Sequence, residues 1–448
     1  MDQASRTLLE LGWGQDPYGH AEPDLTALRL EAVNAVLAER RQQIPILDRR
    51  AREAGIERVA TRADLVPLLF PHTTYKSYPA SFVEKKRWKD LARWLTTLYS
   101  GDLTAVDFDG VADEDEWIDR LRANGHFVLA TSGTTGKYSF LPQSAEDHDR
   151  KVRTYARLLG WPFVRAERDR GYFWLGPHIG VNSATDAAGI GAELWATPGG
   201  SHFLTDDRLR LTDIGTMATM RRRMAEGTVT PGEIAAFEQA QQDREAAVAP
   251  RVDAFVDRLL DQRHEKLVIA GTWGQHLLIM RRARARGIPD GSFHPETVVS
   301  AGGGVKNVAL PDDYKEQVAA FYGEVVRTGN YGMSETFQLM SRCEKLRYHI
   351  PPALIPLVLD RTGETLLNTE DATDRMIEGR FAFVDLSVTG RWSGTITSDK
   401  VTLDTHAQCL CGRPGPTMLD TITRYQTDDD AIGCAGTIDG YIRGALAS

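Results

Sequence analysis

Three stretches rich in glycine and polar residues could bind a phosphorylated ligand. The first, residues 132–137 with the sequence SGTTGK, lies between two apolar runs, although such residues favour neither helix nor strand. Its glycines let backbone N–H groups approach an oxyanion, its hydroxyls can donate to one, and Lys137 adds positive charge. The spacing differs from that of a Walker A loop, so the stretch alone is equally consistent with a solvated loop.

The other two stretches are GNYGMSETF and SAGGGVK. In GNYGMSETF, Glu335 follows an expected strand and a glycine turn, where a carboxylate could hold Mg²⁺ against phosphate oxygens. An exposed loop acid is the alternative for a lone glutamate. In SAGGGVK, consecutive glycines after an apolar run could let a flat base lie against the backbone, and a tight turn is the alternative.

Composition bounds the class of protein that carries these stretches. The chain has 448 residues, of which 42% are hydrophobic and 26% charged, as in an ordinary globular protein. Its net charge of -9 disfavours a nucleic-acid partner, which would need a basic face. No apolar run reaches the roughly 18 residues of a membrane helix, and the start lacks the pattern of a signal peptide. We therefore expect a cytoplasmic protein with no membrane partner.

Short apolar runs that end in glycine loops predict the elements that position these residues. Residues 23–59 have a helical period, and EKKRWKDLARWLTTLYSG predicts a helix that ends at Gly101. Strands are expected in HFVLATSGTTG, GYFWLGPHIGV, HEKLVIAGTWGQHLLIMRRARARGI, ETVVSAGGGVKN and RFAFVDLSVTGRWSGTITSDKVTLD, and residues 208–263 read as a helical elaboration. Strand, glycine loop and helix in repetition indicate an α/β fold with sites at the strand ends.

Taken together and in this order, the stretches resemble the adenylate-forming enzyme superfamily, whose members activate carboxylic acids with ATP. The resemblance spans residues 127–425 and implies a large N-terminal domain of β-sheets flanked by helices. It implies catalytic roles for Thr135, Lys137 and Glu335, with Glu335 on Mg²⁺. It also implies that the nucleotide is bound by Ser132, Gly133, Thr134, Thr135, Gly136, Gly302, Gly303, Gly304, Tyr331, Gly332, Ser334, Asp399 and Arg424.

Two positions depart from the superfamily pattern. Ser398 precedes Asp399 where the superfamily usually has glycine, and KYSFLP follows Gly136 where Pro-Lys is usual, which affects the role expected of Lys137. The segments LVPLLFPHTTYKSYP and RCEKLRYHIPP are most similar to the bioluminescence acyl-protein synthetase and phenylacetate-CoA ligase-like group. His178 and Trp273 are candidate walls of the acid pocket, with core packing as the alternative.

Three of the four cysteines, together with one histidine, suggest a metal site. Cys343 and His349 form one pair and Cys409 and Cys411 a second, and a Cys₃His set suits structural Zn²⁺. The CLCGR sequence also matches members of the resembled group, while buried free thiols are the alternative. Cys434 is left over; its position near the end makes it a candidate acyl acceptor, and an ordinary thiol is the alternative.

The expected organisation is a helical entry region over residues 1–100, an ATP-binding core over 101–425 and a short tail over 426–448. Because few residues follow Arg424, we expect most or all of the superfamily's C-terminal lid to be absent. The predicted activity is Mg-ATP-dependent formation of an acyl-AMP with release of pyrophosphate, then acyl transfer to a thiol or amine, with a carrier protein as one candidate acceptor. The alternatives are an acyl-CoA ligase with a reduced lid and an inactive nucleotide-binding scaffold.

Overall fold

The chain folds into two compact units, each with its own main sheet. A computed structural model describes residues 1–132, 137–302, 310–373 and 375–425. Unit 1 contains Met1–Gly133, Lys137–Leu158 and Tyr331–Ser448, and unit 2 contains Thr134–Gly136 and Leu159–Asn330.

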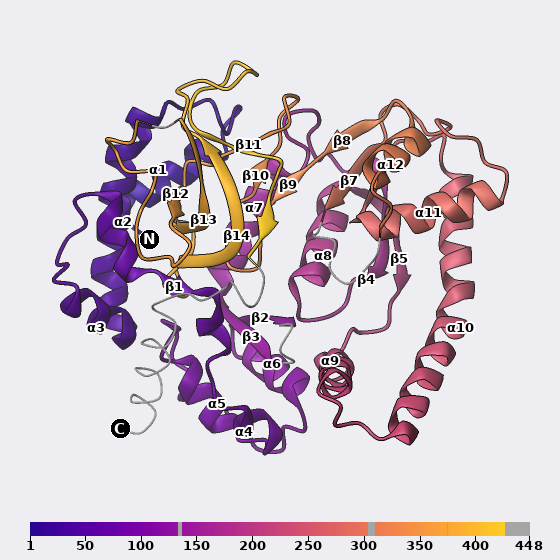
Figure 1. Cartoon of the computed structure of the whole chain (residues 1–448), viewed down its shortest axis with the longest axis horizontal. Coiled ribbons are helices and arrows are strands. Elements are labelled where there is room, and N and C mark those ends of the chain that lie inside the picture. Colours follow the sequence, from indigo (N-terminus) through magenta and orange to yellow (C-terminus); the bar gives the residue numbers. More distant parts are fainter. Residues whose placement is uncertain (133–136, 303–309, 374, 426–448) are drawn as a thin grey trace. The chain divides into compact units, whose positions relative to one another are not determined.

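Helices make up most of the N-terminal part of unit 1 (Figure 1). The longest, α2, has a proline at its start, acidic residues in its first turn and Arg40 and Arg41 in its last, which suits the helix dipole. The α-helices are α1 (Gln3–Gly12), α2 (Glu22–Gln43), α3 (Pro45–Glu53), α4 (Ala80–Glu84), α5 (Trp88–Leu95), α6 (Glu114–Ala123) and α7 (Ala145–Leu158), with 3₁₀ turns at Arg62–Leu68 and His72–Lys76.

The main sheet of unit 1 is largely antiparallel and has the order β11-β15-β14-β13-β12, with β1 and β16 also paired to β14. Its long strands bury apolar side chains such as Phe381, Phe383, Val401 and Leu403 in one cluster. The strands are β1 (Phe70–Pro71), β11 (Arg347–His349), β12 (Leu354–Leu359), β13 (Met376–Asp385), β14 (Gly394–Asp404), β15 (Thr417–Leu419) and β16 (Thr423–Arg424).

Two smaller strand pairs complete this part of the chain. Strands β2 (His126–Ser132) and β3 (Tyr138–Ser144) form an antiparallel hairpin in which Ser132 is opposite Tyr138. Strands β9 (Asn330–Tyr331) and β10 (Met340–Ser341) form the other pair.

The sheet of unit 2 is entirely parallel, with the order β5-β4-β6-β7-β8. Successive residues of its strands enter different clusters, since Phe173 and Ile269 pack with α10 and α11, whereas Tyr172 and Val268 pack with the end of α8. Helices therefore cover both faces, as parallel sheets require. The strands are β4 (Arg170–Pro177), β5 (Ala196–Thr205), β6 (Leu267–Thr272), β7 (Val298–Gly302) and β8 (Val326–Thr328).

Helix α10 is the longest helix of the segment 208–263, which was expected to be a helical elaboration. A capping box between Thr230 and Glu233 starts it, with Pro231 in its first turn. Its second half packs on the sheet through Val252, Phe255 and neighbouring apolar residues, and Figure 1 shows its first half extending away from that sheet. The helices of unit 2 are α8 (Ser183–Trp195), α9 (Leu211–Ala225), α10 (Pro231–Asp261), α11 (Trp273–Ala285) and α12 (Tyr314–Tyr322).

The predicted α/β class, with sheets flanked by helices, is confirmed. One predicted boundary is wrong: α5 ends at Leu95 rather than Gly101. The hydroxyls of Thr96 and Thr97 bond to the carbonyls of Arg93 and Trp94, so local side-chain bonds end the helix early. Among the described residues, no helix is both long enough and apolar enough to span a membrane.

Candidate functional site

Tyr331, Asp399 and Arg424 meet in unit 1. The Tyr331 hydroxyl donates to Oδ2 of Asp399 at 2.7 Å, and Nε of Arg424 donates to Oδ1 at 2.8 Å. The pairing of β14 with β16 places Arg424 directly opposite Asp399. Asp399 is 5% exposed, and both of its oxygens accept hydrogen bonds, so the carboxylate has a fixed orientation.

A cavity of about 490 Å³ adjoins this group and is lined in part by Arg424, Tyr425 and Lys400. Lys400 follows Asp399 on β14 and pairs with Glu378 of β13 at 2.5 Å. The side chain of Arg424 is 54% exposed, so it reaches from the buried Asp399 carboxylate to solvent.

Glu335 lies in a turn that follows Tyr331 and is half-buried. Burial raises the pKa of its carboxyl above the ordinary value, the charges of Arg391 and Arg424 oppose that rise, and Asp399 adds to it. Burial also raises the pKa of Tyr331 well above its usual range, so the phenol remains a hydrogen-bond donor. Glu335, Tyr331, Asp399 and Arg424 are thus close enough for their charges to interact.

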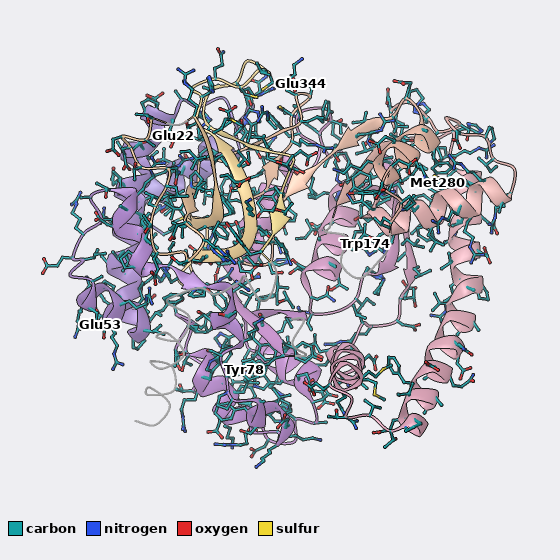
Figure 2. The ribbon with its side chains drawn as sticks, viewed as in Figure 1. Glu22, Glu53, Tyr78, Trp174, Met280 and Glu344 are labelled. Atoms are coloured by element: carbon teal, nitrogen blue, oxygen red, sulfur yellow. The ribbon has the colours of Figure 1, made fainter. Side chains whose placement is uncertain are left out.

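Lys137 lies against Tyr78, which is labelled in Figure 2. Its ammonium donates to the Tyr78 carbonyl and is 4.5 Å from the centre of that ring. Because β3 begins at Tyr138, no helix follows the expected phosphate loop, which lacks the helix-dipole contribution of a Walker A loop. The predicted residues Gly133, Thr134, Thr135 and Gly136 lie outside the described residues, and of Ser132 only the strand is described.

The predicted residues of unit 2 share one edge of its parallel sheet. His178 follows β4, Trp273 follows β6, and Gly302 ends β7, and these strands are neighbours. The His178 ring stacks on Phe203 with centroids 3.8 Å apart, and Trp273 packs at the edge of the core against Tyr314. Their role in an acid pocket stays a prediction, and Gly303 and Gly304 lie outside the described residues.

His276 was not predicted, and it supports the strand that leads into the SAGGG stretch. It is fully buried, its Nδ1 is 2.9 Å from the Tyr322 hydroxyl, and its Nε2 is 3.3 Å from the Ser300 carbonyl. Burial lowers its pKa to about 4, so the ring is neutral near pH 7. A carbonyl only accepts, so Nε2 carries the proton and Tyr322 donates to Nδ1.

Cys343, His349, Cys409 and Cys411 come together in unit 1 as the sequence predicted. Their ligand atoms all lie within 4.8 Å of one another, and Sγ of Cys411 is 3.4 Å from Nε2 of His349. A tetrahedral zinc with bonds of about 2.3 Å to sulfur would separate its ligand atoms by about 3.8 Å. The cluster therefore fits one tetrahedral ion with modest side-chain adjustment.

Two tight turns on paired strands present these ligands. Leu346 N donates back to the Cys343 carbonyl in one turn, and Gly412 N donates to the Cys409 carbonyl in the other. Gly412 has a φ of +89°, which favours glycine. Strands β11 and β15 pair directly and carry His349 opposite Thr417, so a bound ion would cross-link two segments of one sheet.

Burial keeps part of this cluster uncharged. It lowers the pKa of His349 to about 4, so the imidazole is neutral and can bind a metal, and it raises the pKa values of Cys343 and Cys409, so their thiolates need the charge of a bound cation. Arg413 forms a hydrogen bond with Cys411 and a second with Asp16, which brings positive charge beside the sulfur atoms.

Asp385 and Arg391 were also not predicted, although both contact the Glu335 turn. Each is fully buried. Asp385 accepts hydrogen bonds from Thr336 Oγ1 and Phe337 N, and Arg391 donates to the Glu335 carbonyl. The sequence gives a weak indication that both residues are buried. Each is a charged residue within a segment of apolar or small residues, FAFVDLSV for Asp385 and TGRWSG for Arg391.

Comparison with known proteins gives the class of this fold. No protein-family model and no curated protein matches the chain. Solved structures do: 2-hydroxyisobutyryl-CoA ligase in complex with 2-HIB-AMP and CoA, in the thioesterification state, matches with a TM-score of 0.55 and 14% identity over 92% of this chain and 70% of that chain. Its open conformation gives a TM-score of 0.53 at 14% identity over 90% and 70% of the two chains, and its postadenylation state with 2-HIB-AMP gives 0.51 at 13% over 92% and 70%.

The chain therefore has the fold of these solved ligases, and the fold class expected from the resemblance is confirmed. The particular subgroup stays a prediction.

Proposed function

We propose that the protein activates a carboxylic acid with ATP, forming an acyl-AMP and releasing pyrophosphate, and then transfers the acyl group to a thiol. The observation that carries this proposal is the group formed by Tyr331, Asp399, Arg424 and Glu335 on a fold shared with ligases solved with an acyl-AMP-type ligand. Of the four, Tyr331, Glu335 and Asp399 were assigned nucleotide or Mg²⁺ roles from motifs far apart in the sequence, and Arg424 from the segment after them.

The proposed roles follow from charge and position. Asp399, oriented by Tyr331 and Arg424, accepts hydrogen bonds from the ribose hydroxyls, and Glu335 supplies a carboxylate oxygen to Mg²⁺. A Mg²⁺ ion held by Glu335 would supply positive charge beside the phosphates of ATP. The loop at residues 132–137 supplies amide and hydroxyl donors to the same phosphates.

The acceptor is proposed as a thiol because the solved neighbour holds CoA. CoA and the thiol of a carrier protein share this chemistry, and an amine is the second candidate. An inactive nucleotide-binding scaffold is disfavoured, since such a protein would have no need to keep the half-buried Glu335 carboxylate close enough to Asp399 for the two charges to repel.

We further propose that Cys343, His349, Cys409 and Cys411 hold one structural Zn²⁺. The three sulfur atoms and one imidazole match the donor preference of zinc, and the closed ligand set leaves no position for a substrate. Its contribution would be to stability, because it links the turn before β11 with the turn before β15.

The test is a panel of carboxylic acids screened for acid-dependent ATP–pyrophosphate exchange, followed by AMP release with hydroxylamine, which traps an acyl-AMP whatever the natural acceptor is. An acid that supports both reactions establishes adenylation, and repeating the assay with CoA identifies or excludes that acceptor. ATP binding without turnover for any acid would favour the scaffold.

A further inference from the structure

The turn that carries Glu335 is held at three successive residues by two buried charged side chains. Arg391 Nη2 donates to the Glu335 carbonyl at 2.9 Å. Asp385 Oδ2 accepts from Thr336 Oγ1 and from Phe337 N, each at 2.7 Å. Both side chains come from the end of β13 and the segment that leads to β14, so one short stretch of chain fixes the backbone from the Glu335 carbonyl to Phe337.

Arg391 also reaches the hairpin that carries the expected phosphate loop. Its Nη1 donates to the Pro142 carbonyl of β3 at 2.7 Å. The hairpin and the Glu335 turn are thus joined through one guanidinium. Because this group is planar and rigid, it fixes the distance and angle between the Glu335 and Pro142 carbonyls that accept from it. Pro142 and Glu335 both belong to unit 1, so this link lies within one compact unit.

Packing alone does not explain a charge at this position. Arg391 is fully buried, forms no ion pair with any described carboxylate, and its Nε has no hydrogen-bond partner among the described residues. The guanidinium carbon of Arg391 lies 5.3 Å from the centre of the Phe337 ring and 5.8 Å from that of Tyr75, which is the range of cation–π contact. Taking a guanidinium out of water without a carboxylate in direct contact is costly, so its bonds to the Glu335 and Pro142 carbonyls and its attraction to the Glu335 carboxylate must offset that cost.

Asp385 complements it from the other side. It is fully buried, and its second oxygen accepts from the backbone N–H and the hydroxyl of Ser387. Charge-assisted hydrogen bonds of this kind are about twice as strong as neutral ones and are geometrically selective. The carboxylate therefore holds Thr336 and Phe337 against the strand end rather than interacting with a ligand.

We infer that Asp385 and Arg391 are positioning residues, which hold the Glu335 carboxylate and the phosphate-loop hairpin in the relative geometry that Mg-ATP requires. The inference rests on the proposed function, because it needs Glu335 to act on Mg²⁺. Neither residue contacts the nucleotide in this assignment; both act through the backbone of segments that do.

The test measures how much Mg²⁺ strengthens ATP binding in the full-length protein. The dissociation constant of ATP is determined by calorimetry with Mg²⁺ and with EDTA. The ratio of the two constants measures the contribution of Mg²⁺ to ATP binding, because a general loss of structure would weaken binding under both conditions. Wild type, Glu335→Gln, Arg391→Met, Arg391→Lys and Thr336→Val are compared. Arg29→Met is the matched control, since Arg29 is also buried and donates to two backbone carbonyls, those of Pro351 and Pro352.

Glu335→Gln is expected to abolish the Mg²⁺ advantage, and Arg391→Met to reduce it about tenfold, the usual effect of losing an outer-shell partner. Thr336→Val, which removes the hydroxyl bond to Asp385 and the bond that Gln338 N donates to the same hydroxyl, should reduce it by a smaller factor, and Arg29→Met should leave it unchanged. If Arg391→Met does not fold, Arg391→Lys and Thr336→Val decide the question.

The failures are distinguishable. If Glu335→Gln removes the advantage but the Arg391 and Thr336 variants behave like Arg29→Met, positioning is refuted and the proposed function stands. If Glu335→Gln changes nothing, the role of Glu335 on Mg²⁺ is refuted, and the inference falls with it.

Discussion

The hydroxyl of Tyr331 donates a hydrogen bond of 2.7 Å to Asp399, a residue 68 positions further along the chain. The bond joins the turn that carries Glu335 to strand β14, and Arg424 of β16 occupies the other oxygen of the same carboxylate. Two distant motifs are thereby combined in one polar group, and each of its hydrogen bonds can be removed separately.

Tyr331→Phe removes the hydroxyl and keeps the ring. A hydrogen bond to a charged group contributes about 1.5–3 kcal/mol to stability, so we expect a lower unfolding temperature and, because Asp399 loses an orienting partner, a weaker affinity for ATP. The measurement is calorimetric ATP binding. Tyr348→Phe is the matched control, since Tyr348 donates to a different carboxylate, that of Asp420, at 2.8 Å, although its ring is only 6.1 Å from that of Tyr331; an equal loss of ATP affinity in both variants would contradict a nucleotide role for Tyr331.

The pH dependence of pyrophosphate exchange should report Glu335. Burial raises the pKa of this carboxyl, and activity requires its ionised form, so activity is lost as pH falls through a pKa above the ordinary value of about 4.3. The charges that face it are Arg391 and Arg424, which lower the pKa, and Asp399, which raises it.

Arg391→Met removes one of the two cations that lower the pKa of Glu335. The pH below which exchange activity is lost should therefore move to a higher value. The measurement is the pH profile of exchange with an acid identified by the screen. Arg29→Met should leave this pH unchanged, and an unchanged pH in Arg391→Met would show that this charge does not act on Glu335.

Metal analysis of protein purified without added metal should find about one zinc per chain. Cys411→Ser should lose the metal and lower the unfolding temperature, because binding free energy of a structural zinc is folding free energy. Cys434→Ser, which changes the remaining cysteine of the sequence, should keep both. Wild-type protein that is folded and free of metal would rule out the assignment.

Asp147 should contribute to stability in a pH-dependent way. Burial alone would raise its pKa, but hydrogen bonds from the backbone of Ser144, Thr389 and Gly390 and the charge of Arg150 lower it overall. A lowered pKa in the folded state gives stability that is present above the unfolded value of about 3.9 and is lost as pH falls through the folded value.

Asp147→Asn should therefore lower the free energy of unfolding by about 3 kcal/mol at pH 7, and the difference should shrink near pH 3. The measurement is denaturant unfolding at both pH values. Glu146→Gln is the control, because Glu146 contacts the same Arg150 at 3.4 Å but its side chain is 81% exposed; exposed pairs contribute roughly 0–1 kcal/mol.

The sequence alone predicted the elements whose signals are local. Apolar runs next to glycine loops gave the correct positions of β2, β4, β6, β7, β13 and β14, and the charged stretch around Pro231 was correctly expected to be helical. The boundary of α5 was wrong because Thr96 and Thr97 bond to their own helix, a competition that hydrophobic period does not reveal. The predicted domain boundaries and the loop and tail residues outside the described ranges stay predictions.

The types and spacing of side chains were also sufficient to select the four residues that lie together as a candidate metal site, and the residues around Glu335. A Cys₃His set has few other uses, and carboxylates after glycine turns are suited to cations, so these residues could be named before their positions were known. Their convergence follows from the pairing of β11 with β15 and of β14 with β16.

Only the tertiary structure identified Asp385, Arg391 and His276. Each is a buried polar residue whose partners are backbone atoms or side chains distant in sequence, and no spacing rule encodes such contacts. A motif can be recognised in the sequence because the chemistry of the bound ligand requires particular residue types. The supporting residues depend on which strand lies beside which turn, and that arrangement is decided by the packing of the whole unit.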